Sequence, residues 1–360
     1  MILGAAITGL FLALQLIVNH LQITYYTLII LVIFGIIQLI DDFVEYQYKK
    51  FFKATAVLVI AAALAVGSNA ASIWLTYDYG KDSMRGKSEL TFEKEKKTTG
   101  LDKDYATRWS YGIDETLTLL IPNFKGGASG GELGENSETY QFFAKNYGPK
   151  QAKKIVKQLP LYWGTQPFTS GPVYVGAIIV FLFVLGLFLV KGKLKWWLLI
   201  ATVLAILLSW GRNFMPFTEF FLDYVPGYNK FRTVSMTLII VEFTMPLLAF
   251  LTLKNILDNG GIEKEKFLRS LKYSLYIVGG ICLFFALFPG MFFNFLADAD
   301  PEYANSGYPM DLIRNDRETL LRMDAFRSLV FVILGAGLLL AWYYKTLKKT
   351  YIYMLLPVLL

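Results

Sequence analysis

An acid inside an apolar segment is the position where this sequence most directly indicates chemistry. Glu242 lies in the run SMTLIIVEFTMPLLAF, about two turns into a predicted membrane helix and so roughly 10 Å below its outer end at ~1.5 Å rise per residue. A carboxyl group there is costly unless it is paired, neutralised or hydrated. Pro246 has no N–H, which frees the carbonyl of Glu242. Acid and carbonyl could bind a divalent cation or a substrate hydroxyl. Alternatively, a protonated Glu242 could hydrogen-bond a neighbouring helix.

Two further groups of polar residues are predicted at the outer membrane surface. The first is the turn NHLQ, whose side chains could bind a ligand or satisfy two helix ends: Asn19, His20 and Gln22. The second is the segment WGRNFMPFTEFFLDYVPGYNKFR, in which aromatic residues alternate with the cations Arg212, Lys230 and Arg232. Such a segment favours binding of phosphate at headgroup depth, or anchoring by cations that reach any lipid headgroup.

A long polar segment, 78–171, adds a third group of candidates. It contains TRWSYGIDETLTLLIPNFKGG, from which we select Trp109, Asp114 and Glu115 as candidate binding or acid–base residues. An amphipathic helix is expected around residues 138–157. The density of aromatic residues favours an ordered cap over a disordered loop.

Several kinds of site are excluded by residue counts. The chain has one His and one Cys, Cys282, so neither a zinc-finger pattern nor an internal disulfide is possible. No G-x-S-x-G motif accompanies His20, which argues against a hydrolase triad. We therefore assign no metal-ligating residues; the cofactor stays unknown, with a divalent cation possible.

These groups need a membrane bundle to position them. The 360 residues are 55% hydrophobic and 18% charged, with a net charge of +7 and a mean hydropathy of +0.46. This composition excludes a disordered chain, a nucleic-acid-binding module and a disulfide-stapled secreted domain. Runs of about 20 apolar residues can cross a bilayer. They predict an all-α polytopic bundle of eight helices and a partial ninth at 351–360, with spans near 2–18, 23–40, 54–76, 172–190, 196–210, 236–254, 273–296 and 326–344.

The distribution of Lys and Arg orients these spans, because short cytoplasmic loops are enriched in both. Alternate connections are rich in them: Lys49, Lys50, Lys53; Lys191, Lys193, Lys195; Lys254, Lys264, Lys266, Arg269, Lys272; Lys345, Lys348, Lys349. The intervening connections contain fewer. Residues 78–171, 211–235 and 297–325 are therefore predicted to face outward. This divides the chain into helices 1–77, a cap 78–171 and helices 172–360. Because both ends lie within apolar runs, we expect a fragment.

Four segments together resemble the YfhO-like bacterial membrane proteins. They are NHLQITYY, YGKDSMRGKSEL with GLDKDYATRWSYGIDETLTLLIPNFKGG, YWGTQPFTSGPVYVGA, and SWGRNFMPFTEFFLDYVPGYNKFRTVSM, which occur in order between about residues 10 and 345. The resemblance implies a GT-C-like glycosyltransferase of the bacterial cytoplasmic membrane. Such an enzyme transfers a sugar from a polyprenyl-phosphate carrier to a cell-envelope acceptor on the outer face. GT-C enzymes usually carry their catalytic acid in the first outward loop, whereas residues 19–22 contain no acid.

The expected roles follow from that chemistry. Arg232, Lys230 and Arg212 would compensate phosphate charge, and Glu242, Asp114 and Glu115 would contact the acceptor or a metal. A transporter or flippase of a lipid-linked or small solute would use the same intramembrane acid, kinked helix and cationic mouth. A non-catalytic envelope scaffold is the third hypothesis. The expected partners are the bilayer and a polyprenyl-phosphate-linked sugar, and no nucleic acid.

Overall fold

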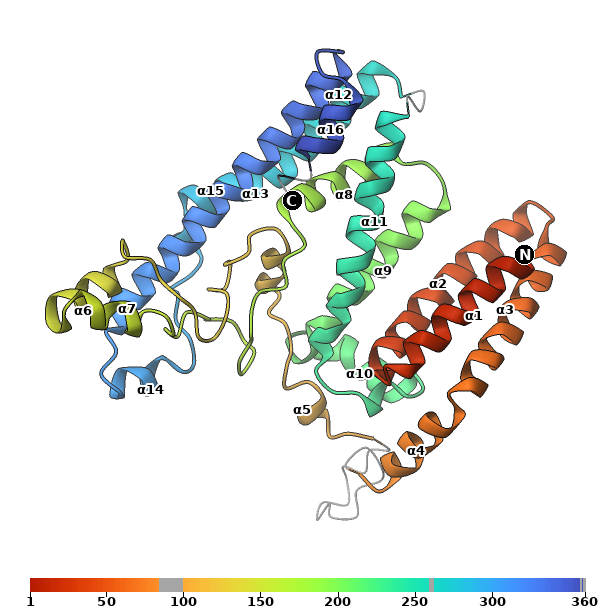
Figure 1. The fold of residues 1–360 in the computed structure, drawn as a ribbon, viewed down its shortest axis with the longest axis horizontal. Helices are drawn as coiled ribbons and strands as arrows, with labels where there is room; N and C mark the ends of the chain where they lie inside the picture. Colours follow the sequence, from red (N-terminus) through yellow and green to blue (C-terminus); the bar gives the residue numbers. More distant parts are fainter. Residues whose placement is uncertain (84–99, 259–261, 357, 359–360) are drawn as a thin grey trace. The chain divides into compact units, whose positions relative to one another are not determined.

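The computed structural model describes residues 1–83, 100–258, 262–356 and 358. These residues form helices and loops, and their β-type pairing is one isolated bridge between Gly131 and Leu159. The expected all-α class is confirmed for this part of the chain (Figure 1). The chain divides into two units, Met1–Ser110 with Gly192–Val241 and Tyr111–Lys191 with Glu242–Leu360. The units interleave in sequence, so neither coincides with one of the three predicted segments.

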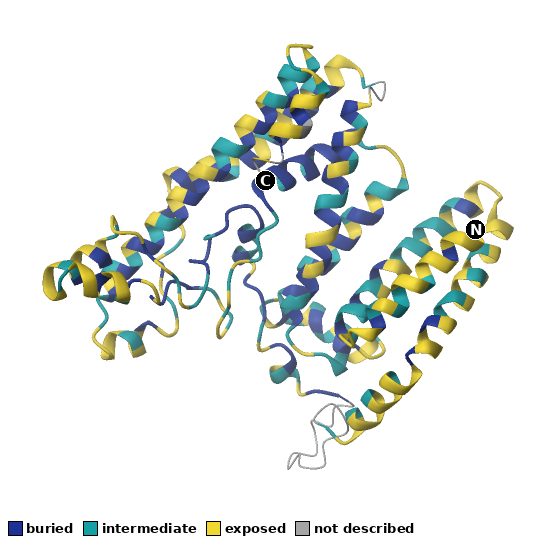
Figure 2. Cartoon of the chain, viewed as in Figure 1, coloured by how far each residue is buried: buried dark blue, intermediate teal, exposed yellow. Residues whose placement is uncertain are grey.

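The first unit is built on long apolar helices. It contains α1 (Ile2–Ile17), α2 (Leu21–Val44), α3 (Tyr48–Ser68), α4 (Ala70–Lys81) and α9 (Lys193–Ser209). Only 11% of the most apolar stretch of α2, and likewise of α3, is buried within the protein. Figure 2 accordingly shows α1 to α3 as mostly exposed. Apolar surface of this extent requires a covering, which a bilayer provides.

A sharp bend ends the α9 helix. The following segment, 3₁₀ helix η2 (Gly211–Phe214) and α10 (Met215–Tyr224), is bent by 108° from α9. Gly211 adopts φ +46°, and a Cβ there would lie 2.0 Å from Ser110 Oγ. A residue with a side chain is therefore excluded by both backbone and space. The chain continues through η3 (Tyr228–Lys230) and η4 (Val234–Thr237).

The second unit contains α8 (Ala177–Leu189), α12 (Lys264–Ser274), the π-helical turn η5 (Leu275–Gly279), α13 (Gly280–Leu287) and α15 (Met310–Tyr343). Helix α11 (Leu238–Leu257) enters it at Glu242. Small residues lie where its helices approach closely: a Cβ on Gly186 would meet Thr252, and one on Gly335 would meet Ile178. Such small-residue contacts are typical of helices that pack within membranes.

The predicted cap contains folded structure within the second unit. It includes η1 (Asp114–Leu119), α6 (Glu138–Tyr147) and α7 (Pro149–Ile155), and it packs on the first turns of α15. Its apolar core joins α6, α7 and α15 through residues such as Tyr140, Val156 and Ile313. Two short helices lie outside residues 78–171, between α13 and α15: η6 (Pro289–Met291) and α14 (Asp300–Asn305). Helix α5 (Lys103–Ala106) belongs to the first unit, and residues 84–99 of the predicted cap lie outside the described part.

Among the residues that the structure describes, five helices are long and apolar enough to cross a membrane, or six if the bent pair α9–α10 is one span. They are α2, α3, η4–α11, α12–α13 and α15. Helices α1 and α8, with 16 and 13 residues, fall short of that length. The predicted span 273–296 ends as an α-helix at Leu287, because Pro289 cannot continue it. At the predicted ninth span, α16 covers Lys349–Leu355.

Candidate functional site

A nearly buried lysine is the centre of the most distinctive polar site in the second unit. Lys125 is 7% exposed, and its Nζ lies 2.7 Å from Asp114 Oδ2. The same Nζ lies 3.7 Å from the ring centroid of Trp163 and 4.7 Å from that of Phe293. One carboxylate and two aromatic faces therefore stabilise this ammonium group.

Backbone contacts hold the lysine and the tryptophan side by side. The N–H of Trp163 donates to the carbonyl of Lys125 at 3.0 Å. The following residue, Gly126, adopts φ +83°, and a Cβ there would lie 1.9 Å from the carbonyl oxygen of Leu161. Only glycine permits this approach of the two segments.

An open hollow of about 450 Å³ adjoins the lysine. Its lining combines the ammonium group and an amide with apolar and aromatic groups: Lys125, Trp163, Gly290, Met291, Phe292, Phe293, Asn294 and Leu296. Met291, Phe292 and Leu296 are exposed. This rim follows α13 by a few residues, so the hollow lies where the candidate span Lys264–Leu287 ends. The arrangement is suited to a ligand with one anionic group and an apolar body.

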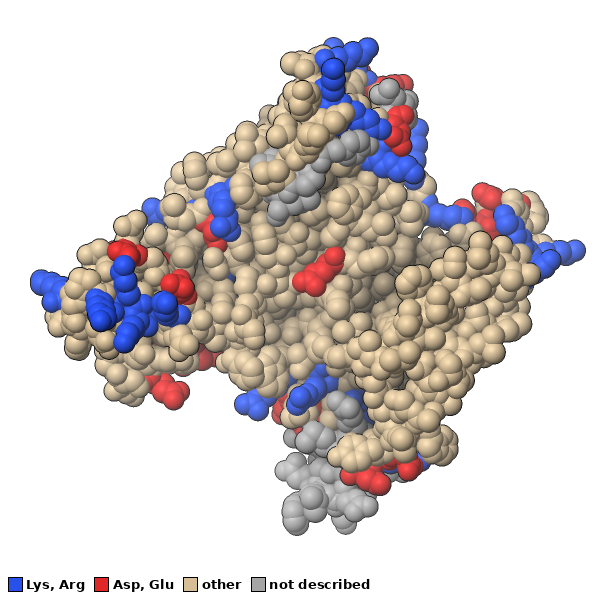
Figure 3. Space-filling model, viewed as in Figure 1, with Lys and Arg blue, Asp and Glu red and all other residues tan. Residues whose placement is uncertain are grey.

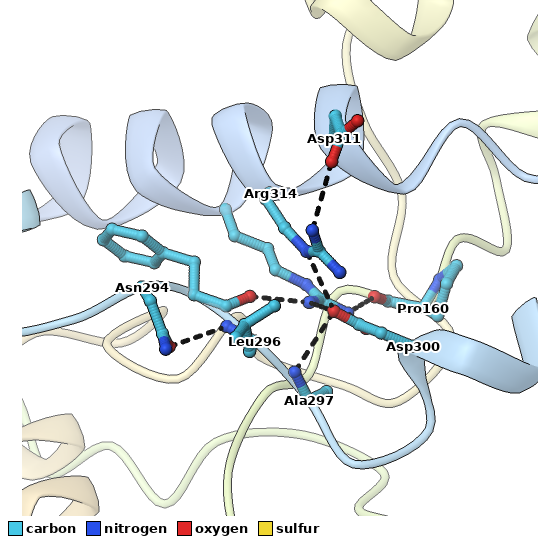
Figure 4. Close-up of polar contacts among 9 residues, drawn as sticks. Pro160, Asn294, Leu296, Ala297, Asp300, Asp311 and Arg314 are labelled. Atoms are coloured by element: carbon cyan, nitrogen blue, oxygen red, sulfur yellow. Dashed lines mark hydrogen bonds and ion pairs between the residues drawn. The ribbon is translucent and has the colours of Figure 1, made fainter. Parts of the chain in front are cut away.

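A buried ion pair anchors both walls of this hollow (Figure 4). Arg317 is 1% exposed and Asp300 2% exposed. Two hydrogen bonds join their side chains, Nη1 to Oδ2 at 3.0 Å and Nη2 to Oδ1 at 2.8 Å. Arg317 also donates to the carbonyls of Phe295 and Pro160. Phe295 lies within the wall segment that carries Phe293, and Pro160 precedes Trp163 by three residues.

Glu115, next to Asp114, has a different environment. It is 3% exposed and accepts from the N–H of Gly112 at 3.0 Å and the hydroxyl of Tyr162 at 2.9 Å. Gln166 Nε2 donates to it at 3.1 Å. Burial raises the pKa of Glu115, although these three donors and the charge of Lys125 oppose the shift. Glu115 therefore organises the loop. Neither acid is among the residues that line the hollow, and Asp114 is connected to it through Lys125.

Burial also shifts the pKa values of the neighbouring Lys125 and Tyr111 side chains. It lowers the pKa of Lys125, against the opposing effect of Asp114. Burial raises the pKa of Tyr111, and the charges of Glu115 and, more weakly, Glu242 add to that shift. A second, partly open cavity of about 10 Å³ lies between Tyr111, Glu115, Lys125 and Tyr162. That volume admits at most one water molecule.

The structure thus brings two predicted acids together with a lysine that the sequence did not single out. Glu242 belongs to the same unit and acts electrostatically on Tyr111, but its side chain is exposed on α11. No group of three or more His, Cys, Asp or Glu side chains in the described residues could hold a metal ion.

The remaining candidates lie in the first unit. Gln22 is buried and its Nε2 donates to the carbonyl of Arg232 at 2.6 Å and to Tyr26 Oη at 2.8 Å. The Arg232 guanidinium lies 5.8 Å from the ring centroid of Tyr105 and donates to its hydroxyl. Gln22 and Arg232, 210 residues apart, therefore meet through a backbone contact.

Three of the other predicted residues of this unit contact segments distant in the sequence through hydrogen bonds. Asn19 donates to Thr76 Oγ1 at 3.2 Å, and His20 is the exposed residue that precedes α2. The N–H of Arg212 donates to Ser110 Oγ at 2.9 Å, and the carbonyl of Trp109 accepts from the N–H of Ser235. Arg212 is exposed and Lys230 half-buried.

Lys125, Trp163, Phe293, Asp300 and Arg317 are the residues that sequence reasoning missed. A lysine within LLIPNFKGG was the one available signal, since an isolated cation among apolar residues and glycines needs a partner when it is buried. Comparison of the chain with protein-family models, curated proteins and solved structures finds no match.

Proposed function

We propose that this chain is a multi-pass protein of the bacterial cytoplasmic membrane, with eight or nine spans, that transfers a sugar from a polyprenyl-phosphate carrier to a cell-envelope acceptor. The observation that carries the proposal is the hollow beside Lys125. It combines a caged cation with exposed apolar side chains directly after a candidate span. A lipid-linked phosphate has the complementary groups, an anion joined to an apolar chain.

The proposed sidedness is supported within the second unit. Helix α15 has 34 residues, about 51 Å at ~1.5 Å per residue. The cap packs on its first turns. Cations gather over α12 and α16, at the other end of α15 (Figure 3): Lys264, Lys266, Arg269, Lys272, Lys345, Lys348 and Lys349. A basic end faces the cytoplasm in most membrane proteins, which favours an outward cap.

The chemistry assigns separate roles to the two side chains of the Asp114–Lys125 pair. The acceptor hydroxyl attacks the anomeric carbon of the sugar and gives its proton to the Asp114 carboxylate. The bond from that carbon to the phosphate oxygen breaks, and the polyprenyl phosphate leaves with one more negative charge. Lys125 stabilises this charge from a largely desolvated position. We retain three cations of the first unit as proposed phosphate contacts: Arg212, Lys230 and Arg232. An Arg232→Ala variant tests the contribution of this group to transfer.

The test is transfer by the purified chain in vesicles, with a panel of radiolabelled polyprenyl-phosphate hexoses and envelope polymer as acceptor. We expect labelled polymer from the wild type and a loss of at least about 100-fold in Asp114→Asn and Lys125→Met. Lys145→Met, an exposed lysine of α6, is the matched control and should retain activity. Movement of the labelled lipid across the vesicle without transfer would instead identify a flippase. Transfer that survives both site variants would contradict the assignment of the site.

A further inference from the structure

The Asp300–Arg317 pair is an unusual way to stabilise a cap. Both side chains are almost fully buried, and Arg317 is the largest fully buried side chain among the described residues. Asp300 Oδ2 accepts in addition from the N–H of Ala297 at 3.2 Å and from Arg314 Nε at 3.3 Å. Figure 4 shows these groups converging on Asp300 from α15 and from the loop before α14.

Stability alone does not require two buried charges at this place. Apolar residues of similar volume often replace such a pair with equal or greater stability, because both charges must be desolvated. An apolar pair, however, cannot hold backbone carbonyls. Arg317 holds two of them, at 2.8 Å from Phe295 and at 2.5 Å from Pro160. Its planar fork binds a carboxylate and two carbonyls in fixed directions, which the single ammonium group of lysine cannot do.

Those two carbonyls belong to the two segments that enclose Lys125. Pro160 precedes Trp163 by three residues, and Phe295 follows Phe293 by two. The ring of Trp163 lies 5.2 Å from that of Phe293 and 5.0 Å from that of Phe295, centroid to centroid. Displacement of either carbonyl therefore moves a ring that contacts the Lys125 ammonium.

We propose that Arg317, fixed by Asp300, is the positioning residue of the Lys125 site: it sets the spacing of the two aromatic segments and thereby the binding of an anionic headgroup beside Lys125. The part that concerns headgroup binding rests on the proposed function. The part that concerns the aromatic enclosure does not, and it is measured on the protein without ligand.

Three variants separate positioning from stability. Arg317→Lys keeps the charge and loses the fork. The double variant Asp300→Leu with Arg317→Met removes both charges and both carbonyl contacts. Arg314→Met is the matched control, because Arg314 also binds Asp300, while no hydrogen bond described in the structure joins it to Pro160 or Phe295.

The first measurement is the rate at which an amine-reactive reagent modifies Lys125 in the purified full chain, followed by peptide mass spectrometry. We expect modification about ten-fold faster in Arg317→Lys and in the double variant, and unchanged in Arg314→Met. The double variant should remain folded, because the gain from removing two buried charges offsets the loss of the two carbonyl contacts. If the double variant is folded and its Lys125 is still modified at the wild-type rate, the proposal is overturned.

The second measurement is the affinity for farnesyl phosphate, with inorganic phosphate as a comparison that lacks the apolar body. We expect about ten-fold weaker binding of farnesyl phosphate in Arg317→Lys and a wild-type value in Arg314→Met. Absence of binding to the wild type would count against the proposed function, while the rates at Lys125 still decide the positioning role. Equal affinities in wild type and Arg317→Lys would refute the role in headgroup binding.

Discussion

At the scale of the residue, the adjacent acids Asp114 and Glu115 have different environments, although the sequence makes both of them candidates. Asp114 is half-exposed and pairs with Lys125, whereas Glu115 is buried and accepts from three donors. The first pairs through a partly exposed carboxylate with the cation that lines the hollow, and the second holds Tyr162 and the turn at Gly112 in place. Burial and hydrogen bonding, rather than residue type, make this difference.

The pH dependence of stability tests the environment of Glu115. Its pKa is raised in the folded state, so the folded protein binds a proton that the unfolded chain releases above about pH 4.3. The free energy of unfolding should therefore fall as pH rises from there through the folded-state pKa of Glu115. Thermal unfolding of wild type and Glu115→Gln at several pH values measures this. A wild-type curve that falls no more steeply than that of the variant would show that burial does not raise this pKa.

At the scale of elements, individual residues decide where apolar runs stop being helices. Hydropathy extended one span to residue 296, but Pro289 ends the helix and leaves Phe292 and Phe293 free to line the hollow. Gly211 likewise allows the 108° bend that takes the chain from α9 into α10. Polar contacts hold other helix ends in place. Asp316 of α15 accepts from the N–H groups of Glu138 and Thr139 at the start of α6.

Substitution of Gly211 tests the bend. Gly211→Ala places a Cβ 2.0 Å from Ser110 Oγ at a left-handed backbone position. We expect a loss of about 2–4 kcal/mol in the free energy of unfolding, from backbone strain and overpacking together. Gly67→Ala is the control, because its Cβ would meet nothing within 4 Å and it lies inside α3. That control should gain about 0.5–1 kcal/mol. Equal midpoints for the two variants would show that the bend does not depend on Gly211.

At the scale of the molecule, the second unit carries cations at both ends: the lysines of α6 and α7 lie beside acids, whereas at the α12 and α16 end cations outnumber acids (Figure 3). Its folded cap lies at one end of α15, and the basic residues of α12 and of the chain after α15 lie at the other (Figure 3). Since positively charged loops stay in the cytoplasm, this unit by itself predicts opposite sides of the membrane for its two ends.

Cysteine labelling measures that sidedness. In a Cys282→Ala background, a cysteine at Lys150 of α7 should react with a membrane-impermeant maleimide in intact cells. A cysteine at Arg269 of α12 should react only after the membrane is permeabilised. Both positions are exposed, so accessibility within the protein does not distinguish them. Reaction of Arg269→Cys in intact cells, with Lys150→Cys protected, would reverse the proposed orientation.

The sequence by itself determined that the chain is helical and rich in membrane-length segments, because the length and hydropathy of a run such as 236–254 act locally along the chain. It also placed Asp114 and Glu115 as candidate residues within the predicted cap 78–171. The tertiary structure alone decided which of them meets Lys125, and that Pro160 and Phe295 are tied together by Arg317. Pro160 and Phe295 are more than 130 residues apart in the sequence. No periodicity encodes such pairings, because burial creates the demand for a partner only after distant segments have packed.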